Sequence, residues 1–335
     1  MKICLVRIDK MGDMVITLPI IQGLKKANDK NLIDVVCSEN NLKISKNVSI
    51  INKTYLLHKK ISSILVVIKN IRKQKYDYIY SFSPGWISII ISLLSKSKSK
   101  SILILQSRYK SGISSKLTER ILCKLFFHNI KIVDRNSYFN QNRSINQSKL
   151  MQQIVRQSGL ELLENEVINN LFQFDKIKYG QIEICLIHLS SKWINKYFSE
   201  DQFINLLDKL ENTGKNIVMS SDQSSGQVFN KIYRKYKKIT NEDFKNLKNI
   251  DEILILDKLD FDNWTSIINS STYVITPECG CTHIASLTDC DLCVIYDADN
   301  LPEMIAQEYA PWKKDYTKFK FNDDNLEEKI ISFIN

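Results

Sequence analysis

The stretch KICLVRIDKMGDMVITLPI, residues 2–20, shows the unit from which the fold is built. Residues 2–7 form a short apolar run with the composition of a buried strand. After a polar loop, Thr17 is placed to cap a helix over residues 18–27, with Pro19 in its first turn. The stretch therefore predicts a strand, a loop at the carboxyl end of that strand, and a helix.

The same unit repeats along the chain, which is typical of parallel sheets covered by helices. The pattern predicts strands near residues 2–7, 33–37, 77–82, 101–105, 182–189, 216–221, 252–256, 273–276 and 292–296. It predicts helices near residues 18–27, 61–73, 86–94, 115–127, 144–158, 203–212, 226–236, 263–270 and 326–334. The fold class is therefore α/β, and ligands are expected at the carboxyl ends of the strands.

A polar segment between Leu160 and Tyr179 separates the two series of strands, and 335 residues are enough for two domains that each bury a core. We expect doubly wound, Rossmann-like domains at residues 1–170 and 171–335. The last helix is expected to pack back on the N-terminal domain.

Composition and motifs exclude several classes of protein. The longest apolar stretch, Trp86–Leu94, is shorter than the roughly 20 residues of a membrane-spanning helix. The first strand follows Met1 without the apolar core of a signal peptide, so we expect a cytoplasmic protein. The chain has no G-x-G-x-x-G after its first strand and no P-loop motif, which argues against dehydrogenases and P-loop enzymes.

The eight cysteines lie mostly in apolar segments, as expected for reduced thiols. Cys279 and Cys281, like Cys290 and Cys293, have spacings that also occur in zinc sites. Cys279 lies in a tight turn, however, and Cys293 opens a strand. No Asp-x-Asp tripeptide lies in a fitting loop, and we expect neither a metal nor a cofactor.

Charge is distributed unevenly along the chain. Residues 1–170 contain 28 Lys and Arg against 11 Asp and Glu, whereas residues 171–335 contain 19 against 26. The halves therefore carry +17 and −7, which indicates that the N-terminal domain meets an anionic partner. A lysine-rich surface that is merely solvated is the alternative.

Two of the loops that follow predicted strands carry groups suited to acid–base chemistry or phosphate binding. In the first, Asp13 can accept a proton from a hydroxyl, although it also fits a turn or a helix cap. The second offers hydroxyl and ammonium groups of the kind that bind phosphate, with solvated loop lysines as the alternative: Ser190, Ser191, Lys192 and Lys196.

A third loop leads from a strand into a short helix and reads Pro277-Glu278-Cys279-Gly280-Cys281-Thr282-His283. A turn of this kind directs backbone N–H groups and the positive end of a helix dipole at one site, which can hold an anion. Alternatively, Thr282 is an ordinary helix cap and His283 a helix-start residue. The chain has only four histidines, and we favour a functional role for this one.

Together the three loops resemble the lipopolysaccharide heptosyltransferases, inverting enzymes of glycosyltransferase family 9 with the GT-B architecture. The resemblance rests on RIDKMGDMV (7–15), on KYFSE (196–200) with Phe203, and on TPECG (276–280) with HIA (283–285). It implies two Rossmann-like domains that face each other across a cleft. The N-terminal domain would bind the acceptor, and the C-terminal domain the nucleotide sugar.

The resemblance also assigns roles to individual residues. It implies that Asp13 is the general base, that Lys196 contacts the donor diphosphate, and that the donor pocket includes Glu278, Cys279, Gly280 and His283. The family usually has Asp-Thr-Gly or Asp-Ser-Gly where this chain has Glu278-Cys279-Gly280, and its glycine-rich turn appears here as SSDQSSG, residues 220–226. Both departures affect the donor side and leave the nucleotide and the sugar open.

We expect metal-independent transfer of heptose or a similar sugar from a nucleotide diphosphate donor, such as ADP-heptose, to an anionic glycolipid or oligosaccharide. Backbone N–H groups from Gly280 to His283, Cys281 and Thr282 included, would stabilise the leaving diphosphate. Basic and flexible residues of the N-terminal domain would hold the acceptor: Lys10, Gly12, Lys59, Lys60, Arg108, Lys110 and Arg120.

The run SKSKSK, residues 95–100, lies beside the apolar segment Trp86–Leu94, which suggests peripheral contact with the inner face of the cytoplasmic membrane. A solvated loop is the alternative. An epimerase or hydrolase of nucleotide sugars is the nearest competing function. A non-catalytic protein that binds carbohydrate or nucleic acid is a further one, although the aromatic residues lie mostly in apolar segments, and we expect no nucleic-acid partner.

Overall fold

The computed structural model describes residues 1–83, 85–106, 117–163, 182–194, 198–221, 228–247, 249–299, 301–311 and 315–335, without the side chains of residues 117–120 and 122. The chain divides into two compact units. The N-terminal unit contains Met1–Gln173 and a return segment, Gln307–Ala310. The C-terminal unit contains Phe174–Ala306 and Pro311–Asn335. The return segment was not expected from the sequence.

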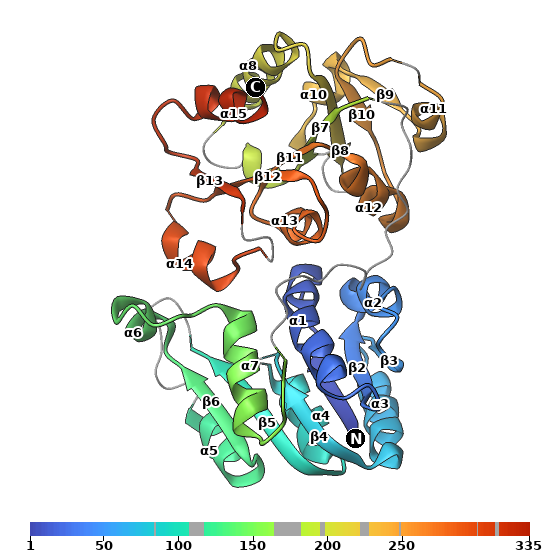
Figure 1. The fold of residues 1–335 in the computed structure, drawn as a ribbon, viewed down its shortest axis with the longest axis vertical. Coiled ribbons are helices and arrows are strands. Elements are labelled where there is room, and N and C mark those ends of the chain that lie inside the picture. The colour runs from blue at the N-terminus through green and yellow to red at the C-terminus, as the bar shows by residue number, and fades with distance from the viewer. Residues whose placement is uncertain are drawn as a thin grey trace. The chain divides into compact units, whose positions relative to one another are not determined.

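The N-terminal unit is built on a six-stranded parallel sheet with the order β3-β2-β1-β4-β5-β6 (Figure 1). Its strands are β1 (Lys2–Arg7), β2 (Leu32–Ser38), β3 (Lys53–Leu57), β4 (Tyr76–Ser81), β5 (Ser97–Leu105) and β6 (Asn129–Val133). The central strands are apolar and buried, as in sheets covered on both faces. The edge strands β3 and β6 are half-exposed and were not predicted.

Helices cover both faces of this sheet. They are α1 (Met11–Ala27), α2 (Glu39–Lys46), α3 (Ile61–Gln74), α4 (Trp86–Leu94), α5 (Leu117–Phe126), α6 (Arg135–Asn140) and α7 (Gln147–Gln157). α1 contacts α2 and α7 on one face, while α4 contacts α3 and α5 on the other (Figure 1). Because side chains alternate along a strand, Cys4 and Val6 of β1 pack on the α3 and α4 side.

The start of α1 corrects one prediction from the sequence. The helix begins at Met11 rather than at residue 18, so Pro19 lies inside it and Thr17 is not its cap. The Thr17 hydroxyl instead donates to the Asp13 carbonyl at 2.8 Å. Lys10 occupies the cap position, and Asp13 folds back to accept a hydrogen bond from the Lys10 N–H at 3.1 Å. An acidic residue in the first turn therefore starts the helix in place of a conventional cap.

The C-terminal unit has a seven-stranded parallel sheet with the order β13-β12-β11-β7-β8-β10-β9. Its strands are β7 (Ile184–Leu189), β8 (Asn216–Ser221), β9 (Lys237–Ile239), β10 (Leu254–Leu256), β11 (Tyr273–Pro277), β12 (Asp291–Tyr296) and β13 (Thr317–Lys320). The edge strands β9 and β13 were not predicted, because both are short and neither contains a buried residue. β7 lies at the centre, paired with β8 and β11.

The described helices of this unit are α8 (Glu200–Glu211), α10 (Ile232–Lys235), α11 (Asn241–Lys245), α12 (Phe261–Ser270), α13 (Gly280–Ala285) and α15 (Leu326–Ile334), with a 3-10 turn at Ser191–Trp193. α14 (Pro302–Glu308) begins in this unit and ends in the return segment. The sequence-based expectation that the last helix packs back on the N-terminal domain stays a prediction. Ile330 and Ile334 of α15 belong to the core of the C-terminal unit, together with Trp193 and Phe203. The apolar stripe of α15 is therefore buried within the C-terminal unit.

Candidate active site

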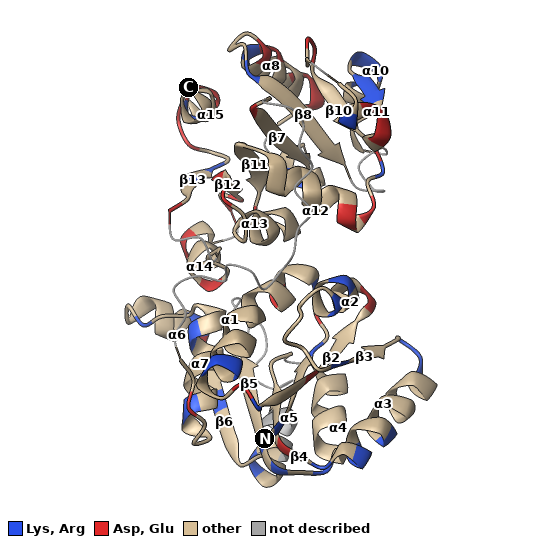
Figure 2. Cartoon of the chain, turned by 45° about the vertical axis from the view of Figure 1, so that its right-hand side comes forward, with Lys and Arg blue, Asp and Glu red and all other residues tan. Residues whose placement is uncertain are grey.

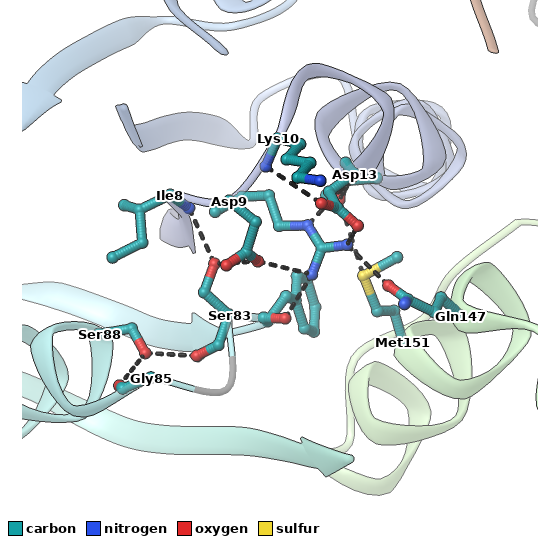
Figure 3. Close-up of polar contacts among 12 residues, drawn as sticks. Ile8, Asp9, Lys10, Asp13, Ser83, Gly85, Ser88, Gln147 and Met151 are labelled. Carbon is teal, nitrogen blue, oxygen red and sulfur yellow. Dashed lines mark hydrogen bonds and ion pairs between the residues drawn. The ribbon is translucent and has the colours of Figure 1, made fainter. Parts of the chain in front are cut away.

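Arg7 organises a polar cluster at the carboxyl end of β1, and its partners Asp13 and Gln147 are labelled in Figure 3. Its side chain is almost completely buried, with 1% of the residue exposed. The guanidinium donates to Asp13 Oδ1 at 3.0 Å and to the Asp13 carbonyl at 3.0 Å. It also donates to Gln147 Oε1 at 2.7 Å and to the Phe82 carbonyl. One buried cation therefore fixes the beginning of α1 against β4 and α7.

Asp13 is held from two sides but is not enclosed. One carboxylate oxygen contacts Arg7, the other accepts from the Lys10 N–H, and 16% of the side chain remains accessible. Asp13 also lies in the first turn of a 17-residue helix, where the helix dipole favours a negative charge. The capping role weighed for Asp13 is thus present in the structure. The base role uses the remaining lone pairs of the same carboxylate and stays a prediction.

Asp9 is a second carboxylate in this cluster, and the sequence did not single it out. Its Oδ2 lies 3.4 Å from Arg7 Nη1 and accepts a hydrogen bond from Ser83 Oγ at 2.7 Å. Burial raises the pKa of Asp9, and the charge of Asp13 adds to the rise, while Arg7 and Ser83 oppose it. Asp9 is therefore more easily protonated than an ordinary aspartate.

The cluster continues into the return segment of the N-terminal unit. Gln147, which accepts from Arg7, donates to Glu308 Oε1 at 3.1 Å. Arg135 lies 3.4 Å from the same oxygen, and Glu308 is fully buried. Gln307 Oε1 in addition accepts from the Ile145 N–H at 3.1 Å. None of these contacts was predictable, because they join residues more than a hundred positions apart.

In the C-terminal unit the second and third loops meet. They follow β7 and β11, which are neighbours in the parallel sheet, so both leave the same edge. Lys192 Nζ lies 2.8 Å from Glu278 Oε2 and also donates to the Glu278 carbonyl. Ser190 Oγ accepts from the Lys192 N–H at 3.4 Å, and Ser191 begins the 3-10 turn. Lys196, the predicted diphosphate contact, lies outside the described residues.

The turn before α13 exposes fewer side chains than the sequence suggested. Glu278, Cys279 and Gly280 are partly exposed. The next three residues are buried: Cys281, Thr282 and His283. The cap residue is Cys279 rather than Thr282, whose Oγ1 accepts from the Cys279 N–H at 3.2 Å. The role of these three buried residues in donor binding stays a prediction, and their backbone N–H groups are the atoms proposed for it.

Cys279 lies against His188, a buried residue of β7. Burial by itself would raise the pKa of the Cys279 thiol, but the hydrogen bond and the charge of His188 lower it below its ordinary value. The Thr276 hydroxyl, 3.4 Å from Cys279 Sγ, contributes to the lowering. His188 Nδ1 lies 3.1 Å from Ser220 Oγ. This thiol is thus unlike the buried thiol of Cys281, whose pKa burial raises.

Only some of the predicted acceptor residues can be placed. Lys10 is exposed beside Asp13, and Gly12 is buried in the first turn of α1. Lys59 and Lys60 are exposed directly before α3. Arg108 and Lys110 lie outside the described residues, as does the side chain of Arg120.

None of the eight cysteines forms a disulfide. Over the residues that the structure describes, no group of three or more His, Cys, Asp or Glu is arranged to hold a metal ion.

Comparison with known sequences decides the family. Residues 64–329 match the profile of Glycosyltransferase family 9 (heptosyltransferase). The chain belongs to this family. No curated protein has a sequence that significantly matches this glycosyltransferase. The matched range covers the loops after β7 and β11 and begins after Asp13. Family membership alone therefore does not assign the general base.

Solved structures show the fold of the glycosyltransferase. A family 9 glycosyl transferase from Veillonella parvula DSM 2008 has a TM-score of 0.71 at 14% identity, covering 99% of this chain and 90% of its own. The E. coli heptosyltransferase WaaC with ADP has a TM-score of 0.72 at 11% identity, covering 100% and 99%. The E. coli ADP-heptose lps heptosyltransferase II has a TM-score of 0.73 at 11% identity, covering 100% and 98%. The predicted fold class, GT-B with two Rossmann-like domains, is confirmed.

Proposed function

We propose that this glycosyltransferase moves heptose or a similar sugar from a nucleoside diphosphate donor to an anionic glycolipid or oligosaccharide in the cytoplasm, with inversion and without a metal ion. The observation that carries the proposal is the carboxylate of Asp13. Arg7 and the Lys10 N–H fix its orientation, and its side chain stays partly accessible. A fixed, accessible carboxylate at a strand end is suited to accept the proton of an acceptor hydroxyl.

The proposed reaction is a single displacement. The acceptor hydroxyl gives its proton to Asp13 as its oxygen attacks the anomeric carbon of the donor. The bond from that carbon to the diphosphate oxygen breaks, and its electron pair leaves with the nucleoside diphosphate. Backbone N–H groups of Gly280 to His283, with Lys192 and Lys196, would stabilise the negative charge that develops, and each preorganised donor is worth about 3 kcal/mol.

ADP-heptose is the first donor to test. The E. coli heptosyltransferase WaaC has been solved with ADP and with ADP-2-deoxy-2-fluoro heptose, the second structure at a TM-score of 0.65 and 13% identity over 95% of this chain and 92% of its own. Here Lys192 is paired with Glu278, so a diphosphate would have to take the place of that carboxylate. Glu278 and Cys279 therefore make donor preference the part of the proposal most worth measuring.

An epimerase of nucleotide sugars is the competing function. A putative UDP-N-acetylglucosamine 2-epimerase from Listeria monocytogenes has a TM-score of 0.56 at 11% identity, covering 99% of this chain and 87% of its own. This likeness is lower than that of the heptosyltransferases and concerns the fold alone. An epimerase or hydrolase would consume the nucleotide sugar without any acceptor, whereas a transferase requires one.

The test is a panel of nucleotide sugars screened by thermal shift, followed by transfer to a glycolipid acceptor measured by mass spectrometry. Asp13→Asn should lower the transfer rate about 10²–10⁴-fold, the usual contribution of a general base, and leave donor binding unchanged. The amide keeps an oxygen that can accept from the Lys10 N–H. Asp29→Asn, on an exposed turn after α1, is the matched control. Transfer that survives in Asp13→Asn at the wild-type rate refutes the assignment of the base.

A further inference from the structure

Large apolar side chains are exposed mainly on three neighbouring helices of the N-terminal unit. Among the described residues, ten of the fourteen exposed large apolar side chains lie on α3, α4 and α5. They form what we call the α3–α5 face: Ile61, Leu65, Val66, Trp86, Ile87, Ile90, Leu94, Ile121, Leu125 and Phe126. Scattered apolar residues on a surface are ordinary, but a gathering on adjacent helices marks an interaction site.

The three helices lie side by side, because α4 contacts both α3 and α5. Each also has an inner side that packs in the core, for example Val67 and Ile71 of α3 and Ile91 of α4. Both α3 and α4 therefore carry apolar residues toward the sheet and further apolar residues on the outer side, where α3 also carries cations. The sequence of α4, WISIIISLL, contains no charged residue. A helix that is apolar all round is normally covered on both sides, either by protein or by lipid.

Cations surround this apolar surface. Neither α3 nor α4 contains an acidic residue, and in Figure 2 α3 carries blue positions while α4 is tan throughout. Among residues whose side chains are described, ten basic residues lie on the three helices or on the segments that flank them: Lys59, Lys60, Lys69, Arg72, Lys73, Lys75, Lys96, Lys98, Lys100 and Lys124. Acidic residues on or near these helices are few. They are Glu119 of α5, Asp77, which lies 2.7 Å from Lys98, and Glu39, which contacts His58.

Two of these cations are anchored at the end of α4. Arg72 donates to the Leu94 carbonyl at 2.9 Å, and Lys100 donates to the Leu93 carbonyl at 2.6 Å. The last carbonyls of a helix have no partner within the helix and carry its negative dipole end, so they attract cations. The positive charge is thus held directly beside the exposed Leu94.

We propose that the α3–α5 face docks on the surface of a lipid bilayer that contains anionic lipids. Apolar side chains would enter the boundary between headgroups and acyl chains, while the surrounding cations would contact the headgroups. In the described part of the chain, no helix has the length and apolar character to cross a bilayer, so the contact is peripheral. The sequence pointed to α4 and the lysines after it, and the structure adds α3 and α5 to the same surface.

Other occupants fit the face less well. A second copy of the chain would bring these cations against the same cations of its partner, and like charges brought together in an interface oppose association. A nucleic acid would meet the cations but would leave ten apolar side chains in contact with a polar backbone. An anionic bilayer offers acyl chains to the apolar side chains and negative headgroups to the cations.

The position of the face also suits a lipid-linked acceptor, a consequence that rests on the proposed function. Asp13 follows β1, and α3 and α4 follow β3 and β4, all at the carboxyl edge of one parallel sheet. The apolar face therefore starts at the edge that holds Asp13. An acceptor anchored in the bound leaflet would present its headgroup near this edge.

The test is cosedimentation of the full chain with vesicles of phosphatidylcholine alone or mixed with phosphatidylglycerol. Binding should require phosphatidylglycerol and should weaken as salt is raised. Leu65→Ser with Ile90→Ser removes apolar surface, and Lys69→Ala with Lys73→Ala removes two cations. We expect binding to weaken about tenfold or more in the first variant and about fivefold for each cation in the second. Leu301→Ser and Lys258→Ala change exposed residues of the C-terminal unit and should bind as the wild type does.

Failure to sediment with anionic vesicles, or unchanged binding in both double variants, overturns the proposal. A dimer seen by light scattering and abolished by Leu65→Ser with Ile90→Ser overturns it in favour of self-association. Transfer to a detergent-dispersed acceptor is measured in parallel. Vesicle binding without transfer would refute the proposed function and leave the surface standing, whereas transfer without vesicle binding would refute only the surface.

Discussion

Replacing Arg7 by methionine tests whether its guanidinium holds the candidate site together. Methionine is apolar and of similar reach, but it has no charge and no N–H group. In Arg7→Met, Asp9 and Asp13 lose the cation that lies between them, and Gln147 Oε1 and the Phe82 carbonyl lose an N–H donor. The perturbation therefore removes one partner from a buried ionic network.

The cost follows from burial. Removing one partner of a buried ion pair destabilises a protein by about 3–5 kcal/mol, against a total stability of about 5–15 kcal/mol. For a unit of this size, about 1 kcal/mol corresponds to about 2–4 °C, so the unfolding midpoint of the N-terminal unit should fall by about 6–20 °C. Transfer should fall with it, as in Asp13→Asn, because Asp13 loses the group that orients it. Donor binding to the C-terminal unit should be unchanged.

The assay is urea and thermal unfolding, with a second arginine as control. Arg72 is exposed and makes its hydrogen bond to the Leu94 carbonyl at the surface, so Arg72→Met should change stability by less than about 1 kcal/mol. The double variant Arg7→Met with Asp13→Asn should recover part of the loss, since one uncompensated carboxylate is gone. If Arg7→Met costs no more than Arg72→Met, Arg7 does not hold the network.

Two further predictions concern protonation. Burial raises the pKa of Asp9 above its ordinary value of 3.8, so the folded protein holds this proton more tightly than the unfolded chain, and stability is lost as the pH rises through the raised pKa. Asp9→Asn should therefore gain stability relative to the wild type at neutral pH and lose this advantage below about pH 3.8, as urea titrations would show; an advantage that grows in acid contradicts the reasoning. Because His188 lowers the pKa of Cys279, iodoacetamide should label Cys279 faster than Cys281 in native protein followed by mass spectrometry. His188→Gln should slow the labelling of Cys279. If Cys279 is labelled at the same rate in His188→Gln as in the wild type, His188 is not the cause of its reactivity.

The strands that the sequence predicted are those with continuous apolar runs. β1, β2, β7 and β12 lie inside their sheets, where both faces are covered and nearly every residue must be apolar. The missed strands were at sheet edges. Lys237–Ile239 and Thr317–Lys320 are short and polar, and they are strands only because a neighbour supplies the hydrogen bonds.

The candidate site was also predictable only in part. The loops after β1, β7 and β11 were predicted because parallel strands have their carboxyl ends at one edge of a sheet. The contact between Lys192 and Glu278 follows from the pairing of β7 with β11. The exposure of individual side chains could not be predicted from the order of the strands. The burial of His283 and the helical position of Asp13 depend on where α13 and α1 begin.

The sequence by itself determined the α/β repeat, the two units, the family and the loops in which chemistry is expected, because periodicity and loop position are local properties of a chain. Only the tertiary structure decided that Arg7 is the common partner of Asp9, Asp13 and Gln147, and that three helices leave one apolar face uncovered. Contacts between residues far apart in sequence depend on which faces pack together. Which faces pack together depends on apolar area and charge over the whole unit. No short stretch of residues is therefore enough to predict it.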